Sequence, residues 1–247
     1  MASLQSTYKH SNLLPPLSGS ALKVIAVLSM VADHCTYYLM EHGTLLYEVM
    51  RCFGRIAFPV FAFLIAESFQ HTRNRMKYFL QLLGFAVISE VPWYLLNGAD
   101  GTHNVLFTLA LGVWALAAME ALKKDDILCG AVILSITCFA TWSGVDYEWR
   151  GILMMVVFYL FGNVSNPSFP SGRKAQIICS FLLMMHYGIV GALLACLVIA
   201  CYNGTRGFIH GQVAKYGFYA FYPVHLIAID ITLYLNVFLN SLICLNS

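Results

Sequence analysis

Long apolar runs, separated by short charged breaks, constrain the fold of this 247-residue chain more than any other feature. Hydrophobic residues make up 60% of the sequence and charged residues only 11%, whereas a soluble domain carries about 25% charged residues. Such a chain cannot cover a water-facing surface, so we expect a lipid bilayer to be its solvent. Because a helix satisfies its own backbone hydrogen bonds in lipid, we predict an all-α, polytopic integral membrane bundle.

We predict about nine transmembrane spans in this bundle. Several apolar runs are shorter than the roughly 20 residues of a full crossing, so some spans should be tilted, re-entrant or broken. Residues 175–203 form either one long helix or a hairpin that turns at Tyr187 and Gly188. Pro59 is expected to kink the second span because it cannot donate a backbone hydrogen bond. The predicted spans lie near residues 22–40, 54–70, 77–96, 104–122, 126–142, 151–164, 175–188, 190–203 and 216–240.

The distribution of Lys and Arg distinguishes the hairpin from the single long helix. With nine spans and a cytoplasmic N-terminus, eleven of the 14 basic residues fall on the inner side and three on the outer side. A merged helix would place Arg206 and Lys215 on the outer side, which leaves nine basic residues inside and five outside. Basic residues are enriched on the cytoplasmic side of membrane proteins, so we favour the hairpin. The predicted inner residues are Lys9, Lys23, Arg73, Arg75, Lys77, Lys123, Lys124, Arg173, Lys174, Arg206 and Lys215, and the outer ones are Arg51, Arg55 and Arg150.

The remaining composition indicates a single domain over residues 1–247. We find no repeat, low-complexity tract or linker, and residues 1–20 are predicted to be a polar cytoplasmic segment. This segment lacks the apolar core of a signal peptide, so the first span is expected to remain as an anchor. Most cysteines lie in apolar runs without metal-like spacing, so we predict no disulfide framework and no metal site. The net charge of +2 gives no support for nucleic-acid binding.

The first span, LKVIAVLSMVADH, places a lysine and a histidine in line. Lys23 and His34 are eleven residues apart, which on a helix is three turns with roughly 20° left over. The rise between them is about 16 Å, half of a hydrocarbon core of roughly 30 Å. We therefore expect Lys23 at the cytoplasmic surface and His34 near the middle of the bilayer. This arrangement suits a cofactor that has a charged end and a reactive end.

Polar side chains inside the spans are the main functional candidates, because each ionisable group costs a few kcal/mol in lipid unless it is paired or hydrated. His34 lies beside Asp33, so we interpret it as a general base. The arginine and glutamate of the second span are equally well explained as interhelical partners. The asparagine and threonine of the fourth span are better explained as packing hydrogen bonds. The other polar residues of the spans are Arg55, Glu67, His71, Glu90, Asn104, Thr108, Tyr222, His225 and Asp230.

A cationic loop, HTRNRMKYF, follows the second span. It contains His71, Arg73, Asn74, Arg75 and Lys77, at the same predicted surface as the start of the first span. Positive-inside topology alone explains these charges about as well as a binding role does. The functional alternative is a phosphate clamp for a nucleotide-bearing cofactor that enters from the cytosol. The chain has no Gly-rich P-loop and no dinucleotide fingerprint, so ATP hydrolysis and nicotinamide chemistry have no support.

Seven blocks of sequence resemble the TraX family of bacterial membrane proteins. They occur in the same order as in the family, between about residues 18 and 230, and the second block is very specific. The resemblance implies an enzyme of the bacterial cytoplasmic membrane that acetylates the N-terminus of pilin subunits. It also implies a distant relation to transmembrane acyltransferases that modify surface glycans. The blocks are LKVIAVLSMVADH, GRIAFPVFAFLIAESFQHTRN, ISEVPW, NVLFTL, DYEWRGIL, YNGTRG and KYGFYAFYPVHL.

From this resemblance we expect a membrane acetyltransferase that uses cytosolic acetyl-CoA. The glycan enzymes use a basic residue, ten intervening residues and a histidine, which Lys23 and His34 match, although Lys stands where Arg is usual. His34 would be the catalytic base, aligned by Asp33, Glu67 or Glu90, or would itself take the acetyl group. The CoA phosphates would lie on Lys23 and the cationic loop, and the acceptor would be an amine or hydroxyl of a pilin-like protein or a surface glycan. The expected acceptor and oxyanion residues are Arg55, Asn104, Thr108, Tyr222 and His225.

Two other functions fit parts of the pattern. A proton-coupled transporter could use Asp33, His34, Glu67, Glu90 and Asp230 as a relay. However, the chain has no internal symmetry, and the cationic loop has no evident role in transport. A structural membrane subunit would have little use for so many intramembrane charges. Binding of CoA or acetyl-CoA would distinguish the enzyme from both.

Overall fold

The computed structural model describes residues 15–162 and 172–245, and helices make up nearly all the regular structure of this part. No β-strand occurs among the described residues; isolated bridges join Leu17 to Tyr202 and His103 to Val145. The predicted all-α class is therefore confirmed for this part of the chain. The helices are α1 (Gly19–Leu39), α2 (Leu45–Gly54), α3 (Ala57–Gln70), α4 (Arg75–Asn97), α5 (Val105–Ala121), α6 (Asp126–Trp142), α7 (Glu148–Gly162), α8 (Gly172–Met184), the 3₁₀ turn η1 (Met185–Tyr187), α9 (Ile189–Ala200) and α10 (Gly211–Leu245).

Short polar side chains fix where several of these helices begin. The first backbone N–H groups of a helix have no partner inside it, and a side-chain oxygen just before the helix can accept from one of them. Ser18, Thr44 and Asn74 cap α1, α2 and α4 in this way. Asn104 and Asp125 cap α5 and α6. The starts of these five helices are therefore specified locally by the sequence.

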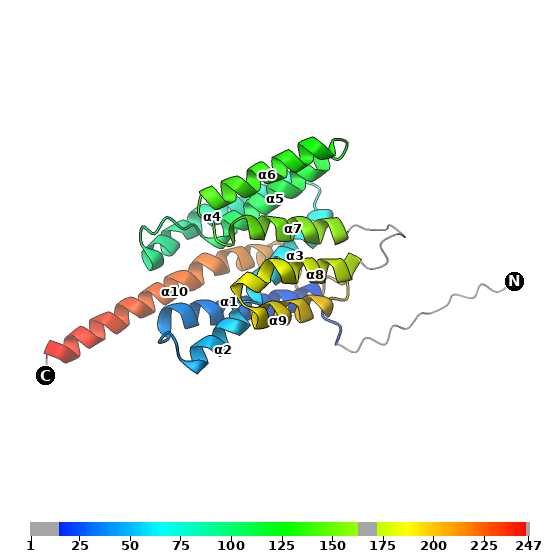
Figure 1. The fold of residues 1–247 in the computed structure, drawn as a ribbon. Helices are drawn as coiled ribbons and strands as arrows, with labels where there is room; N and C mark the ends of the chain where they lie inside the picture. Colours follow the sequence, from blue (N-terminus) through cyan, green and yellow to red (C-terminus); the bar gives the residue numbers. More distant parts are fainter. Residues whose placement is uncertain (1–14, 163–171, 246–247) are drawn as a thin grey trace.

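The helices pack into a bundle, and the connections that the structure describes lie at its two ends (Figure 1). α3 is the central helix: it packs against α1, α5, α7 and α9, and ten of its 14 residues are buried. Phe63 and Phe69 of α3 are fully buried, and each meets an aromatic ring of α7, Phe158 and Tyr159, edge to face. Close packing of apolar side chains around α3 thus holds the bundle together.

The second predicted span differs from expectation at its start. A separate helix, α2, precedes it and packs on α1, and the chain turns at Arg55 and Ile56 before α3 begins. Pro59 lies in the first turn of α3, where a missing N–H is tolerated. The predicted kink at Pro59 is therefore wrong in position. The break instead falls at Arg55, four residues before Pro59. Because proline has no N–H group, the carbonyl of that residue lacks its usual helical hydrogen bond.

The hairpin predicted within residues 175–203 is present. α8 runs into the 3₁₀ turn η1, and α9 begins after Gly188, whose φ of 130° suits glycine and few other residues. The two helices then pack against each other. The turn lies where the sequence predicted it, at Tyr187 and Gly188.

The lengths of the helices bear on the number of membrane crossings. Four described stretches are long and apolar enough to cross a membrane: α1, the α2–α3 stretch Leu45–Gln70, α4 and α10. α5 and α6 have 17 residues each, and α9 has 12, which at 1.5 Å per residue is about 18 Å. The apolar helices thus indicate a membrane protein, whereas the count of nine crossings stays a prediction. α10 is 35 residues long, and its C-terminal part extends beyond the other helices (Figure 1).

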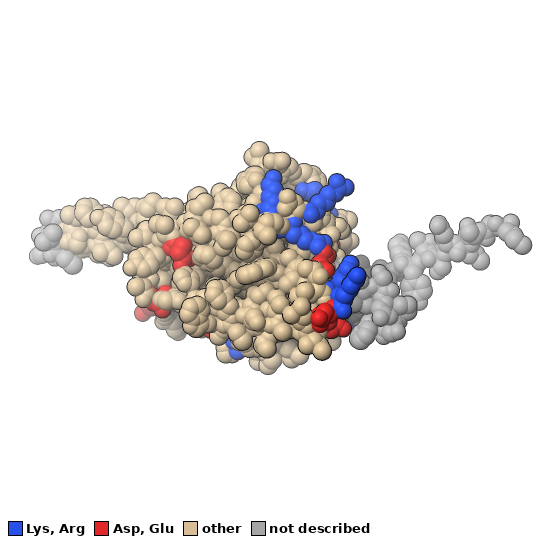
Figure 2. Space-filling model, turned by 90° about the horizontal axis from the view of Figure 1, so that it is seen from above, with Lys and Arg blue, Asp and Glu red and all other residues tan. Residues whose placement is uncertain are grey.

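Basic side chains gather at one end of the bundle. Most of the Lys and Arg visible in Figure 2 lie toward the end at which α1 begins. We predicted these basic residues on the inner side of the membrane. Those that the structure describes belong to the start of α1, the α3–α4 turn and the start of α4, the α5–α6 turn, the start of α8, and the loop before α10 with its first turns. Arg51, Arg55 and Arg150 belong to the opposite end, and Lys9 lies outside the described residues. This division into two ends agrees with the predicted topology; which end faces the cytosol stays a prediction.

Candidate active site

A cavity of about 950 Å³ lies between α1, α3, α4, α5 and α10. It begins at the basic end of the bundle and reaches His34, in the C-terminal part of α1, and the loop between α6 and α7. We call these two parts the mouth and the deep end. The predicted site residues that line the cavity are Lys23, Asp33, His34, Glu67, His71, Asn74, Lys77 and Tyr222.

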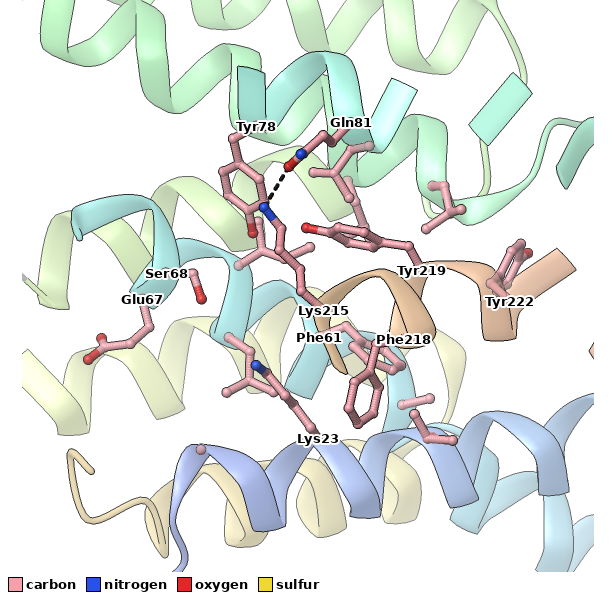
Figure 3. A pocket seen from close by; sticks show the side chains of 18 of the residues that line it. Lys23, Phe61, Glu67, Ser68, Tyr78, Gln81, Lys215, Phe218, Tyr219 and Tyr222 are labelled. Atoms are coloured by element: carbon pink, nitrogen blue, oxygen red, sulfur yellow. Dashed lines mark hydrogen bonds between the residues drawn. The ribbon is translucent and has the colours of Figure 1, made fainter. Parts of the chain in front are cut away.

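The mouth of the cavity is built from several segments that are distant in sequence (Figure 3). Lys23 of α1 and Lys215 of α10 extend into it, and Glu67 lies on α3 nearby. The Lys215 ammonium donates a hydrogen bond to Gln81 Oε1 of α4 at 2.6 Å. Arg206 comes from the loop before α10, and its backbone carbonyl accepts two hydrogen bonds of 2.9 Å from the start of α1. The mouth is therefore held by contacts among α1, α4 and α10.

Basic groups outnumber carboxylates at the mouth. Besides the two lysines, the basic groups there are His71, Lys77 and Arg206. Among the described residues that line the mouth, Glu67 is the only carboxylate. Glu67 Oε1 in turn accepts a hydrogen bond of 3.5 Å from the Tyr202 hydroxyl. Cations that line one small space repel each other, and a bound polyanion relieves that repulsion. The mouth is thus suited to a phosphate-bearing ligand.

α1 connects the mouth with the deep end. Lys23 and His34 both line the cavity, as their spacing on one helix face predicted. Asp33 lines it too, but its carboxylate pairs with Arg51 Nη1 of α2 at 2.7 Å. Gly54 lets α2 approach this carboxylate, because a methyl group at that position would overlap it. The α1–α2 contact therefore determines where the Asp33 charge lies.

The nearest hydrogen-bonding partner of the His34 ring is another histidine. His34 Nδ1 lies 2.6 Å from His225 Nε2 of α10. The two rings are within 14° of parallel, with centroids 4.9 Å apart. Because the nitrogens are closer than stacked ring planes can be, the rings meet edge to edge. His225 is 7% exposed, and its Nδ1 lies 3.0 Å from the carbonyl oxygen of Phe221, one turn earlier on α10.

Tyr222, Asp146 and Tyr147 complete the deep end. The Tyr222 hydroxyl is buried and has no hydrogen-bond acceptor among the described residues. The Tyr147 ring stacks on Phe58 with centroids 3.7 Å apart, and its φ of 62° is uncommon for a residue other than glycine. Burial raises the pKa of Asp146, in the α6–α7 loop, to about 6. The deep end therefore combines an imidazole, a free hydroxyl and a carboxyl group.

Glu90, Asn104 and Thr108 are not among the residues that line the cavity. Glu90 pairs with the His103 ring and accepts a hydrogen bond of 2.6 Å from the Asn104 amide. Asn104 also caps α5 through its side-chain oxygen. Thr108 donates to the backbone carbonyl of Asp146. These contacts tie α4, α5 and the α6–α7 loop together beside the deep end.

Three arginines of the prediction also lie outside the lining of the cavity. Arg75 pairs with Glu120 of α5, and Arg73 is exposed in the α3–α4 turn. The Arg55 guanidinium lies 5.7 Å from the centroid of the Tyr187 ring at the other end of the bundle. The structure thus brings only part of the cationic loop, His71, Asn74 and Lys77, to the cavity.

The structure also adds residues that the sequence analysis did not assign to a site. Arg206 and Lys215 line the mouth, Asp146 and Tyr147 line the deep end, and Arg51 pairs with a lining residue. The first four belong to the sequence blocks YNGTRG, KYGFYAFYPVHL and DYEWRGIL, so the blocks themselves contained a signal. What the sequence did not reveal is the packing that brings the loops before α7 and α10 to α1.

The cavity joins a place for a polyanion to a place for proton transfer. A ring nitrogen of His34 can take a proton, and the Tyr222 hydroxyl can donate to an oxygen that becomes negative. Their rings are 6.1 Å apart, so both groups can reach one small functional group between them.

Comparisons with known proteins give a family and two relatives. The TraX protein family matches residues 18–232. A probable fimbrial assembly protein FimC, serogroup H1, from Dichelobacter nodosus is 32% identical over 240 residues, which covers 85% of this chain and 93% of that protein. The uncharacterized protein RP591 from Rickettsia prowazekii (strain Madrid E) is 26% identical over 142 residues, which covers 56% of this chain and 54% of that protein. No solved structure matches the chain.

Proposed function

This chain belongs to the TraX family, and on that premise we propose that it is a membrane acetyltransferase that takes its acetyl group from cytosolic acetyl-CoA. One observation carries the proposal: a single cavity joins the cationic mouth to His34, in the C-terminal part of α1. The acceptor is an amine of a fimbrial subunit, since a relative that aligns over 93% of its length is a probable fimbrial assembly protein.

The donor matches the cavity in size and in charge. Acetyl-CoA carries its phosphates at one end and its thioester at the other end of a long, thin arm. Lys23, Arg206 and Lys215 would bind the phosphates, and the arm would follow α1 to His34, a rise of about 16 Å. The volume of about 950 Å³ is near the upper limit of the roughly 300–1,000 Å³ of small-molecule sites, as a donor of this size requires.

The chemistry at the deep end uses groups of this chain in three roles. A lone pair of the His34 ring removes a proton from the acceptor amine while the amine nitrogen attacks the thioester carbonyl. The Tyr222 hydroxyl donates to the carbonyl oxygen, which becomes negatively charged. The C–S bond then breaks, His34 returns the proton to the thiolate, and CoA and the N-acetylated acceptor leave. An acceptor hydroxyl would react in the same way.

The proposed orientation places the mouth in the cytosol. The basic side chains of the described residues gather at this end, as positive-inside topology expects. It follows that the N-terminus is cytoplasmic and that the phosphates of acetyl-CoA bind without crossing the membrane. With α2 and α3 as one crossing, the bundle crosses the membrane nine times.

The test of this function is the transfer of label from radiolabelled acetyl-CoA. The purified protein in lipid nanodiscs is given membrane proteins extracted from cells that lack the gene. Wild type should label an acceptor, and His34→Ala should reduce transfer by at least about 100-fold while CoA still binds. His186→Leu, at an exposed histidine of the opposite end, is the matched control and should equal wild type. Undiminished transfer by His34→Ala would contradict the role of His34.

A second measurement separates the enzyme from a proton-coupled transporter. CoA that binds the folded protein raises its melting temperature. We expect such a rise with CoA and with acetyl-CoA, and a smaller one with a donor analogue that lacks the nucleotide. A wild-type protein that neither responds to CoA nor transfers label would contradict the proposed function.

A further inference from the structure

We propose that His225 is a positioning residue for His34, because it determines which ring nitrogen of His34 carries the proton. The proposal rests on the proposed function, in which His34 is the base. It starts from the contact of 2.6 Å between His34 Nδ1 and His225 Nε2, which joins α1 to α10 across 191 residues of sequence. We call these two residues the histidine pair.

The backbone of α10 fixes the proton of His225. The Phe221 carbonyl oxygen, 3.0 Å from His225 Nδ1, can only accept a hydrogen bond. In a neutral ring the proton therefore lies on His225 Nδ1, and Nε2 has the lone pair. His34 Nδ1 must then donate to that nitrogen, because two lone pairs at 2.6 Å would repel each other. The Nε2 atom of His34 is thereby left with its lone pair, as a base requires.

The surroundings of the histidine pair keep both rings neutral. Asp33 adjoins the pair on α1, but its carboxylate is paired with Arg51 of α2. Tyr38 of α1 and Tyr222 of α10 face the pair with ring centroids 6.3 and 6.1 Å from His34, and Asp146 of the α6–α7 loop lines the same end of the cavity. No described carboxylate hydrogen-bonds to either ring. A charged ring here would be a buried ion without an anionic partner, which is strongly unfavourable.

A neutral partner has a consequence for catalysis. When His34 Nε2 takes the proton of the acceptor, the ring becomes a cation, and its Nδ1–H donates a stronger, charge-assisted hydrogen bond to His225. A carboxylate partner would stabilise that cation more and hold the proton more tightly. The neutral imidazole therefore orients the base and still lets it return the proton to the CoA thiolate. In this arrangement His225, and not Asp33, Glu67 or Glu90, orients the ring.

Two substitutions separate orientation from packing. His225→Leu fills the space but removes the acceptor for His34 Nδ1, so the ring can adopt the other tautomer. We expect acetyl transfer to fall by at least about 100-fold while CoA affinity and melting temperature stay close to wild type. His225→Gln provides a side-chain oxygen close to the position of Nε2. We expect it to restore transfer to within about tenfold of wild type, because the tautomer is kept.

Nitrogen NMR of protein labelled in its histidines tests the tautomer without any need for activity. The resonances of His34 are assigned by their loss in His34→Ala. We expect His34 to carry its proton on Nδ1 in wild type and in His225→Gln, and to lose that preference in His225→Leu.

The outcomes distinguish this proposal from the proposed function. A proton on His34 Nε2 in the wild-type protein would overturn the positioning role, and so would wild-type transfer by His225→Leu. If the tautomer is as expected but no transfer from acetyl-CoA occurs, the proposed function is wrong and the positioning of the ring stands. Loss of transfer in both His225 variants, with CoA affinity intact, would show that His225 itself takes part in proton transfer, which also overturns a purely positioning role.

Discussion

Lys23 contributes an ammonium group to a mouth that Arg206 and Lys215 also line. If these groups bind the phosphates of CoA, Lys23→Ala should weaken CoA binding by about tenfold or more, since a hydrogen bond to a charged group contributes about 1.5–3 kcal/mol. The affinity of wild type should also decrease more steeply with salt than that of the variant. Calorimetric titration in nanodiscs at two salt concentrations measures both effects.

Lys124→Ala is the matched control for this prediction. Lys124 lies at the same end of the bundle, exposed in the α5–α6 turn, and is not among the residues that line the cavity. Its removal should leave the affinity unchanged. Equal affinities of wild type and Lys23→Ala would show that Lys23 does not contact the donor.

The ion pair between Asp33 and Arg51 allows a test of how an unpaired charge at the deep end affects stability. Their side chains are 16% and 17% exposed and form an ion pair of 2.7 Å. Arg51→Ala removes the ion-pair partner of a carboxylate packed against Gly54, so we expect the free energy of unfolding to fall by about 2–4 kcal/mol. Adding Asp33→Asn should recover much of this loss, because the buried charge is then absent. Denaturation of both variants in micelles measures the difference; full stability of Arg51→Ala would mean that the carboxylate does not need its partner.

At the scale of single residues, spacing along one helix could be predicted and contacts between helices could not. Lys23 and His34 line one cavity because eleven residues bring a helix back to the same face. His225 contacts His34 across 191 residues, and no rule of spacing joins them. The sequence therefore offered Asp33, Glu67 and Glu90 as partners of His34. Their carboxylates instead contact Arg51, Tyr202 and His103, respectively.

At the scale of elements, Gly54 is where the close approach of α2 to α1 can be tested. A methyl group there would overlap the Asp33 side chain, so Gly54→Ala should lower the free energy of unfolding by about 1–3 kcal/mol. Gly84→Ala is the matched control within α4, where nothing lies within 4 Å of an added methyl. It should leave stability unchanged or raise it by up to about 1 kcal/mol, because alanine favours helix more than glycine does. Equal effects of the two substitutions on denaturation in micelles would contradict the close approach.

The elements that the sequence predicted best are those whose apolar runs end at clear breaks. The α8–α9 turn falls at Gly188, as expected. α2 was missed because it is only ten residues long and carries Glu48 and Arg51, so it resembles a charged loop between spans. The position of the break near Pro59 was missed for a different reason. The effect of a proline falls on the carbonyl four residues earlier, and whether the helix bends or begins anew depends on packing.

At the scale of the whole molecule, the topology gives a prediction that does not depend on catalysis. Reporter proteins fused after Lys124, in the α5–α6 turn, should remain in the cytosol. Reporters fused after Asp100, between α4 and α5, should be exported, because these residues lie at opposite ends of the bundle. A fluorescent protein that folds only in the cytosol, paired with a phosphatase active only outside it, measures the side of each fusion. The reverse pattern would contradict the cytosolic mouth.

The whole-molecule features that the sequence predicted rest on composition and charge. Few charged residues and many apolar ones exclude a soluble fold, and the arrangement of Lys and Arg separates the two ends of the bundle. The cavity was not predictable in this way, because its walls come mainly from α1, α3, α4, α5 and α10 and its volume depends on their mutual packing. Because this packing is not visible in the sequence, Arg206 and Lys215 were used only as evidence for topology, although they line the mouth of the cavity.

The most direct test of the account is the position of the CoA thiol within the cavity. Met30 lines the cavity one turn before His34, and Ser68 lines it beside Glu67 near the mouth. CoA activated as a mixed disulfide is added to Met30→Cys and to Ser68→Cys, and mass spectrometry of the peptides measures the rate of adduct formation at each site. The account predicts that Met30→Cys reacts faster, above the background of the native cysteines, and that excess acetyl-CoA prevents the reaction. Faster reaction at Ser68→Cys, or reaction that acetyl-CoA does not slow, would contradict it.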